Sequence, residues 1–124
     1  MRRVGMFFCG AYWLALTVLL LVPNPFALLG LTRLKGHGIP NRGVHFTAFL
    51  LLTLVTRGVQ SKKARLWPVL VVLVLYAVAT ETLQLAVVGR TVELPDYFEN
   101  LLGIAAGVLV SVLWRSRGEA KVER

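Results

Sequence analysis

The sequence has few of the residues that soluble enzymes and metalloproteins depend on. It holds one cysteine, Cys9, so no internal disulfide can form, and two histidines, so a transition-metal site is not expected. It contains no Gly-rich phosphate loop, no H-E-x-x-H and no G-x-S-x-G. These absences argue against ATP-driven chemistry and the common hydrolase mechanisms, and we expect no cofactor.

Charge is also scarce. Charged residues make up 16% of the 124 residues and hydrophobic ones 56%, with a mean hydropathy of +0.70. Soluble domains carry about 25% charged residues. Because a membrane span needs roughly 20 apolar residues, the chain has room for about four spans and little else. The composition predicts an all-α, polytopic membrane protein whose main partner is the lipid bilayer.

The net charge of +8 does not indicate a nucleic-acid partner. The basic residues sit at the ends of apolar runs, as topology determinants do, and no basic stripe with interleaved aromatic residues is present.

We expect one membrane domain, residues 1–124, with spans at about 4–22, 43–59, 66–88 and 97–114. A cleaved signal peptide is the alternative for the first run, but that run is long enough to span and no clear small-x-small site follows it. The second run is short. It reaches 59 if Arg57 extends its charge to the interface, and a re-entrant segment is the alternative.

The distribution of Lys and Arg predicts the orientation. With four spans, ten of the 14 lie on the side that holds both termini and the middle loop, and four lie on the other. The positive-inside rule therefore predicts that both termini are cytoplasmic.

This topology brings a set of polar residues together on the outer side of the membrane. Helical spacing places Glu81 and Gln84 on one face, and Asp96 and Asn100 on another. The second face continues through Gly103 and Gly107, a small-xxx-small pair that suits either an internal helix contact or a homo-oligomer. The predicted outward-facing pocket consists of His45, Glu81, Gln84, Arg90, Asp96 and Asn100.

Two interpretations of this cluster stay open. In an enzyme, Glu81 or Asp96 would be the acid or base, Arg90 would clamp an anion, and His45 would relay a proton. In a purely structural cluster, the same residues would join helices by hydrogen bonds and ion pairs. Glu81 lies deepest, and a carboxylate there must be protonated or paired.

The ordered series of motifs resembles a known family. His45-Phe46, Glu81-x-x-Gln84, Gly89-Arg90 and Asp96-x-x-x-Asn100-x-x-Gly103-x-x-x-Gly107, over roughly residues 40 to 110, are similar to the VanZ-like family of small bacterial membrane proteins. That family commonly has Asp-Lys before the histidine. This chain has Asn41-Arg42, which keeps the base and loses the acid.

The resemblance implies a protein of the bacterial cytoplasmic membrane and cell envelope, with an antibiotic-resistance link to teicoplanin. Together with the predicted topology, it favours a protein that binds or modifies an anionic ligand, such as a lipid-linked cell-wall precursor or a phospholipid headgroup. Gln84, Arg90, Asn100 and Arg42 would bind this ligand. The alternative is a non-enzymatic accessory or transport module, and the sequence does not decide whether the protein is an enzyme.

The topology predicts the outcome of reporter fusions. Reporters at Gln60 and at the C-terminus should report the cytoplasm, and a reporter at Gly89 should report the outer side. A reporter at Gln60 found outside would contradict both the topology and the convergent cluster.

Overall fold

The computed structural model describes residues 2–23, 30, 43–61, 63–88 and 93–122. These residues form four helices: α1 (Arg2–Leu21), α4 (Val44–Val59), α5 (Leu66–Gln84) and α6 (Leu94–Val122). No strand occurs in this part of the chain. The all-α prediction is confirmed.

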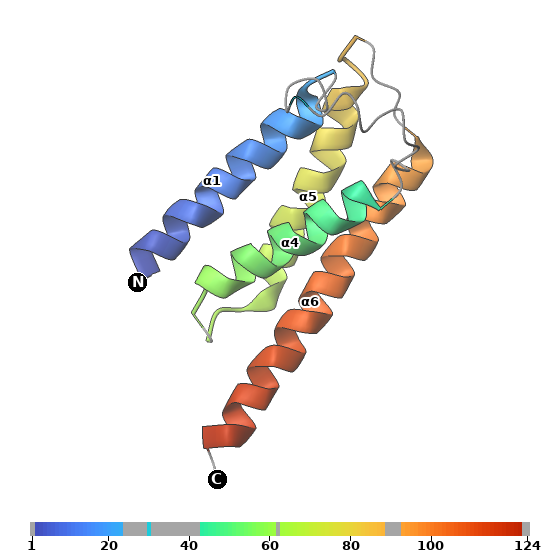
Figure 1. Ribbon diagram of the computed structural model, residues 1–124. Coiled ribbons are helices and arrows are strands. Elements are labelled where there is room, and N and C mark those ends of the chain that lie inside the picture. The colour runs from blue at the N-terminus through green and yellow to red at the C-terminus, as the bar shows by residue number, and fades with distance from the viewer. Residues whose placement is uncertain (1, 24–29, 31–42, 62, 89–92, 123–124) are drawn as a thin grey trace.

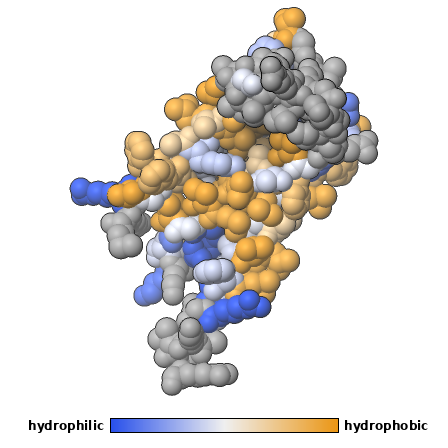
Figure 2. All heavy atoms as spheres, viewed as in Figure 1, coloured by the Kyte–Doolittle hydropathy of each residue, from blue (hydrophilic) through white to orange (hydrophobic). Residues whose placement is uncertain are grey.

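Three of the helices are long and apolar enough to cross a membrane, within Arg3–Leu21, Leu66–Gln84 and Leu94–Arg117. α4 is apolar but has 16 residues, which rise about 24 Å against roughly 30 Å of hydrocarbon. Large apolar side chains such as Phe7 and Leu75 are 73% and 63% exposed. Figure 2 shows hydrophobic residues across much of the middle of one face. The prediction of a helical membrane protein is confirmed.

The four helices run alternately up and down (Figure 1). Both termini and the turn between α4 and α5 lie at one end, here called the termini end. At the other end, here called the loop end, α1 and α5 finish while α4 and α6 begin. Residues that start α4, finish α5 and start α6 are therefore brought to the same end of the bundle.

The bounds of two helices, α5 and α6, differ from those of the expected spans. α5 ends at Gln84, four residues before the expected end at 88, because Leu85, Ala86 and Val87 donate turn-type bonds to the carbonyls three residues back. α6 starts at Leu94, with Pro95 in its first turn, and continues to Val122, beyond the expected end at 114.

The most extensive helix contact is that between α4 and α6, and two glycines make it close. A Cβ atom at Gly107 would lie 2.6 Å from the Cβ of Thr53 and 3.0 Å from the carbonyl oxygen of Leu50. A Cβ atom at Gly103 would collide with the carbonyl oxygen of Phe46. The small-xxx-small pair of α6 thus lies against the backbone of α4 in the same chain.

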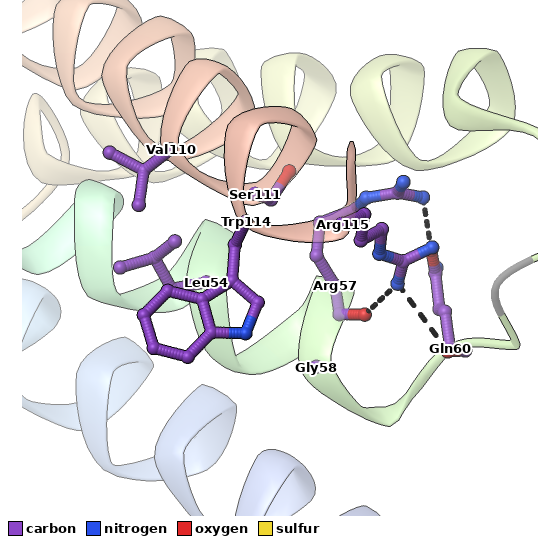
Figure 3. Close-up of a pocket in the computed structure, with 8 residues that line it drawn as sticks. All are labelled: Leu54, Arg57, Gly58, Gln60, Val110, Ser111, Trp114 and Arg115. Carbon is purple, nitrogen blue, oxygen red and sulfur yellow. Dashed lines mark hydrogen bonds between the residues drawn. The ribbon is translucent and has the colours of Figure 1, made fainter. Parts of the chain in front are cut away.

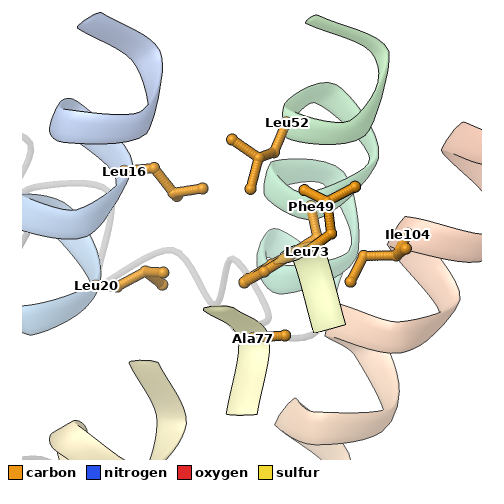
Figure 4. Packing of buried hydrophobic residues seen from close by; sticks show 7 residues of the cluster. All are labelled: Leu16, Leu20, Phe49, Leu52, Leu73, Ala77 and Ile104. Carbon is orange, nitrogen blue, oxygen red and sulfur yellow. The ribbon is translucent and has the colours of Figure 1, made fainter. Parts of the chain in front are cut away.

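All four helices contribute to one hydrophobic core (Figure 4). Tyr76 of α5 joins this core to α1. Its hydroxyl lies 2.8 Å from the hydroxyl of Thr17. The centroid of its ring lies 4.5 Å from that of Trp13, in an edge-on arrangement, and 5.9 Å from that of Phe49. The fully or nearly buried members of the core are Leu16, Leu20, Phe49, Leu52, Leu73, Ala77 and Ile104.

The close contact of α4 and α6 predicts that Gly103→Ala lowers the unfolding temperature in detergent. Overpacking against a backbone carbonyl costs about 1–3 kcal/mol, which exceeds the gain of about 1 kcal/mol in helix propensity. Gly10→Ala on α1 is the matched control, because a Cβ atom there meets nothing within 4 Å. It should leave the unfolding temperature unchanged or raise it. Equal unfolding temperatures for Gly103→Ala and the wild type would contradict the close contact.

Candidate functional site

The start of α4 is held against α6 at the loop end. Gly43, which precedes α4, has a φ of 90°, a conformation that glycine adopts at little cost. Its backbone N–H donates a hydrogen bond of 2.8 Å to Oε2 of Glu99 on α6. This bond fixes the position of the first turn of α4, and with it the position of His45.

Three polar side chains from three helices meet at this end, and we call them the triad: His45 of α4, Glu81 of α5 and Asn100 of α6. Nδ1 of His45 lies 3.1 Å from Oε1 of Glu81 and 3.1 Å from Oδ1 of Asn100. Nδ2 of Asn100 donates a hydrogen bond of 2.6 Å to the same Oε1. The three side chains therefore contact one another pairwise.

These contacts decide which nitrogen of His45 carries a proton. Both atoms that face Nδ1 are acceptors: Oδ1 of Asn100 is a carbonyl oxygen, and Oε1 of Glu81 already accepts from Asn100. Nδ1 is therefore the donor, and Nε2 of the neutral imidazole presents a lone pair. Within the part of the chain that the structure describes, Nε2 makes no hydrogen bond.

Glu81 is the most deeply enclosed member of the triad. Its side chain is 0% exposed, whereas that of His45 is 11% exposed. Oε2 of Glu81 is buried and has no hydrogen-bond partner among the residues that the structure describes. A buried carboxylate oxygen without a partner is costly, so its persistence needs an explanation in function or in an additional bound group.

Glu81 lies nearer to the end of its helix than to the end of the expected span. The sequence places it about seven residues from the end of its span. In the structure it lies three residues before the end of α5, about 4.5 Å along the helix axis. Glu81 is therefore shielded by the surrounding helices more than by its depth along α5.

Gln84 does not join the triad. It is 1% exposed, and its Nε2 donates a hydrogen bond of 2.9 Å to the backbone carbonyl of Leu20, near the end of α1. Glu81 and Gln84 do share a buried face of α5, but they bind different neighbours. Gln84 attaches α1 to the three helices that the triad joins.

Asp96 lies at the rim of the triad, one turn before Asn100 on α6. It is partly exposed, and its Oδ2 accepts a bond of 3.4 Å from the backbone N–H of Glu93. It is close enough to His45 and to Glu81 to interact with both electrostatically. Its carboxylate therefore adds negative charge near His45 and Glu81.

The family assignment follows from a comparison with protein-family models. The model described as VanZ/LLP1 matches residues 18–115, which include the end of α1, all of α4 and α5, and most of α6. The chain belongs to the VanZ-like family. The comparisons with curated proteins and with solved structures gave no match.

The matched region of this VanZ-like chain includes the whole triad. Arg42 and Arg90, the two cations expected to bind a ligand, lie outside the described residues. Among the described residues, no group of three or more His, Cys, Asp or Glu is placed to hold a metal ion. The triad itself holds one imidazole, one carboxylate and one amide, which are groups able to hydrogen-bond and, for the first two, to exchange protons.

Glu99 has a role that sequence reasoning missed. Judged from the sequence, the helix dipole is a sufficient reason for an acidic side chain near the start of a helix. The structure shows that it also binds the backbone N–H of Gly43. Nothing in the sequence could identify this partner, because a backbone N–H has no residue-specific signature.

Proposed function

We propose that this VanZ-like membrane protein binds or modifies an anionic, membrane-bound ligand of the cell envelope at the loop end, centred on the triad. The observation that carries the proposal is the buried carboxylate of Glu81, whose Oε2 has no partner and whose Oε1 orients the imidazole of His45. Buried ionisable groups in membrane proteins mark functional sites more often than structural ones.

The chemistry of the pair supports proton transfer. With Nδ1–H directed at Glu81 and Asn100, the free Nε2 of His45 can accept a proton from a ligand, and the Glu81 carboxylate stabilises the imidazolium that results. In this arrangement His45 faces the ligand and Glu81 acts through it. Asp96 and Arg90 complete the proposed site as a second carboxylate and an anion clamp.

The distribution of basic residues supports an outer location. Ten of the 14 Lys and Arg residues fall within residues 2–3, 57–65 and 115–124, and the described parts of these segments lie at the termini end. The positive-inside rule places that end in the cytoplasm and the loop end outside. Ligands available there include lipid-linked cell-wall precursors and phospholipid headgroups, and the family name adds a link to glycopeptide resistance, teicoplanin included.

A second candidate function is supported by the hydrogen bonds themselves. The triad joins α4, α5 and α6, and Gln84 adds α1 through the carbonyl of Leu20. A non-enzymatic accessory or transport module would need these bonds only to hold its helices together.

Native mass spectrometry on protein extracted from its own membrane in mild detergent separates the two candidates. We expect the wild type to retain an anionic lipid or lipid-linked precursor that Glu81→Gln and Arg90→Ala lose, while the unfolding temperature changes little. Glu81→Gln keeps the shape of the side chain and an acceptor at Oε1, so it tests the carboxylate more than the packing. Glu93→Gln, on an exposed glutamate of the same end, is the matched control and should retain the ligand.

The opposite result is equally clear. If all four proteins carry the same lipids and Glu81→Gln lowers both the unfolding temperature and the abundance in the membrane, the triad only joins helices.

A further inference from the structure

A second site lies at the termini end, between α4 and α6, and does not depend on the proposed function. A groove of about 430 Å³ opens there, and Figure 3 shows two arginines at one part of it and apolar side chains at another. Its volume is within the range of small-molecule sites, roughly 300–1,000 Å³.

Arg57 is the unusual residue of this groove. It is 5% exposed, although the sequence led us to expect that it extends its charge to the interface. Its Nη1 donates a hydrogen bond of 2.9 Å to Oε1 of Gln60. Nε is buried and has no partner, and Nη2 makes no hydrogen bond to the described part of the chain. The edge of the guanidinium formed by Nε and Nη2 therefore makes no hydrogen bond to the described residues.

The Nε and Nη2 edge determines which kind of group could bind to it. Two parallel N–H groups on one planar edge match two oxygens of a carboxylate or a phosphate. In the described part of the chain, no carboxylate pairs with Arg57. Four of the six acidic residues, Glu81, Glu93, Asp96 and Glu99, lie at the loop end, and the side chains of the other two, Glu119 and Glu123, are outside the described part of the structure.

Arg115 adds a second positive charge beside Arg57. Its guanidinium donates to the carbonyl oxygens of Arg57, Gln60 and Ser61, which are among the last of α4 and its turn. A cation is favourable at a helix C-terminus, so these bonds explain Arg115. They do not explain Arg57, since the two arginines lie close enough to repel each other. A bound anion would relieve this repulsion.

The rest of the groove fits the apolar part of a lipid. Leu54 of α4 and Val110 of α6 line it together with Trp114, which is 80% exposed. Tryptophan is enriched at the level of lipid headgroups, where its ring meets both acyl chains and water. The groove therefore combines two arginines with an apolar surface and an exposed tryptophan.

We propose that this groove binds a phosphate group, with Arg57 donating from Nε and Nη2, and that the headgroup of an anionic phospholipid supplies the phosphate. Free inorganic phosphate offers the same oxygens, and the experiment separates the two sources.

The test uses the purified wild type in nanodiscs that contain phosphatidylglycerol and monogalactosyl diacylglycerol, an uncharged lipid without phosphate, followed by native mass spectrometry. We expect phosphatidylglycerol to be retained preferentially, and Arg57→Gln to reduce that preference about tenfold, the scale for losing a charged hydrogen-bond partner. Arg117→Gln removes the same charge from an exposed position on α6 and should change nothing.

A second variant avoids the arginines. Gly58 lines the groove, and a Cβ atom there meets nothing within 4 Å, so Gly58→Leu should fold and obstruct the groove. It should reduce the retention of phosphatidylglycerol to the level of Arg57→Gln. Ligands that depend on Glu81 should be retained by both variants, which keeps this test separate from that of the loop end.

A parallel measurement of the unfolding temperature in detergent, with and without inorganic phosphate, identifies the source. Stabilisation of the wild type but not of Arg57→Gln by inorganic phosphate alone would indicate a free phosphate. Stabilisation by phosphatidylglycerol only would indicate the lipid. The proposal is wrong if the wild type retains both lipids equally and inorganic phosphate has no effect, or if Arg57→Gln and Arg117→Gln lose lipid equally.

Discussion

The burial of one carboxylate, that of Glu81, determines how the loop end is built. A charged or polar group inside a helical bundle in lipid needs partners, because neither hydrocarbon nor water can supply them there. Oε1 of Glu81 accepts a hydrogen bond from the amide of Asn100 and lies within hydrogen-bond distance of the imidazole of His45. Three helices must therefore be positioned together before even one carboxylate oxygen has its partners. Its second oxygen remains without a partner. The same arrangement therefore joins three helices and encloses a carboxylate that is hydrogen-bonded through one of its two oxygens within the described part of the chain.

The close contact between α4 and α6 makes this meeting geometrically feasible. Gly103 and Gly107 allow the backbone of α4 to approach α6 more closely than any larger side chain would permit. The close approach brings His45 within hydrogen-bond distance of Asn100, which lies one turn before Gly103 on α6. At the other end of the same contact, Arg115 of α6 binds the last carbonyls of α4. The α4–α6 pair is thus held at both ends by polar groups and in the middle by close packing.

Hydropathy and charge predict much of the fold and little of the site geometry. Four apolar runs separated by basic or Pro- and Gly-rich segments predict four helices, because length and polarity are properties of the sequence itself. The partner of Gln84 was not predictable, since the carbonyl of Leu20 is a backbone group. The burial of Arg57 was not predictable either, because an arginine near the end of an apolar run gives no sign of which helix will pack over it. Arg42 and Arg90 stay predictions.

The central claim is that Glu81 and Asn100 hold His45 with its proton on Nδ1 and its Nε2 free. Nitrogen-15 NMR of histidine-labelled protein tests this directly, and His37→Gln leaves His45 as the one labelled residue. At a pH where the imidazole is neutral, we expect a protonated Nδ1 and an unprotonated Nε2 in the wild type. In Glu81→Leu we expect this preference for the Nδ1–H tautomer to be lost. A proton on Nε2, or a rapid average of the two tautomers in the wild type, would contradict it.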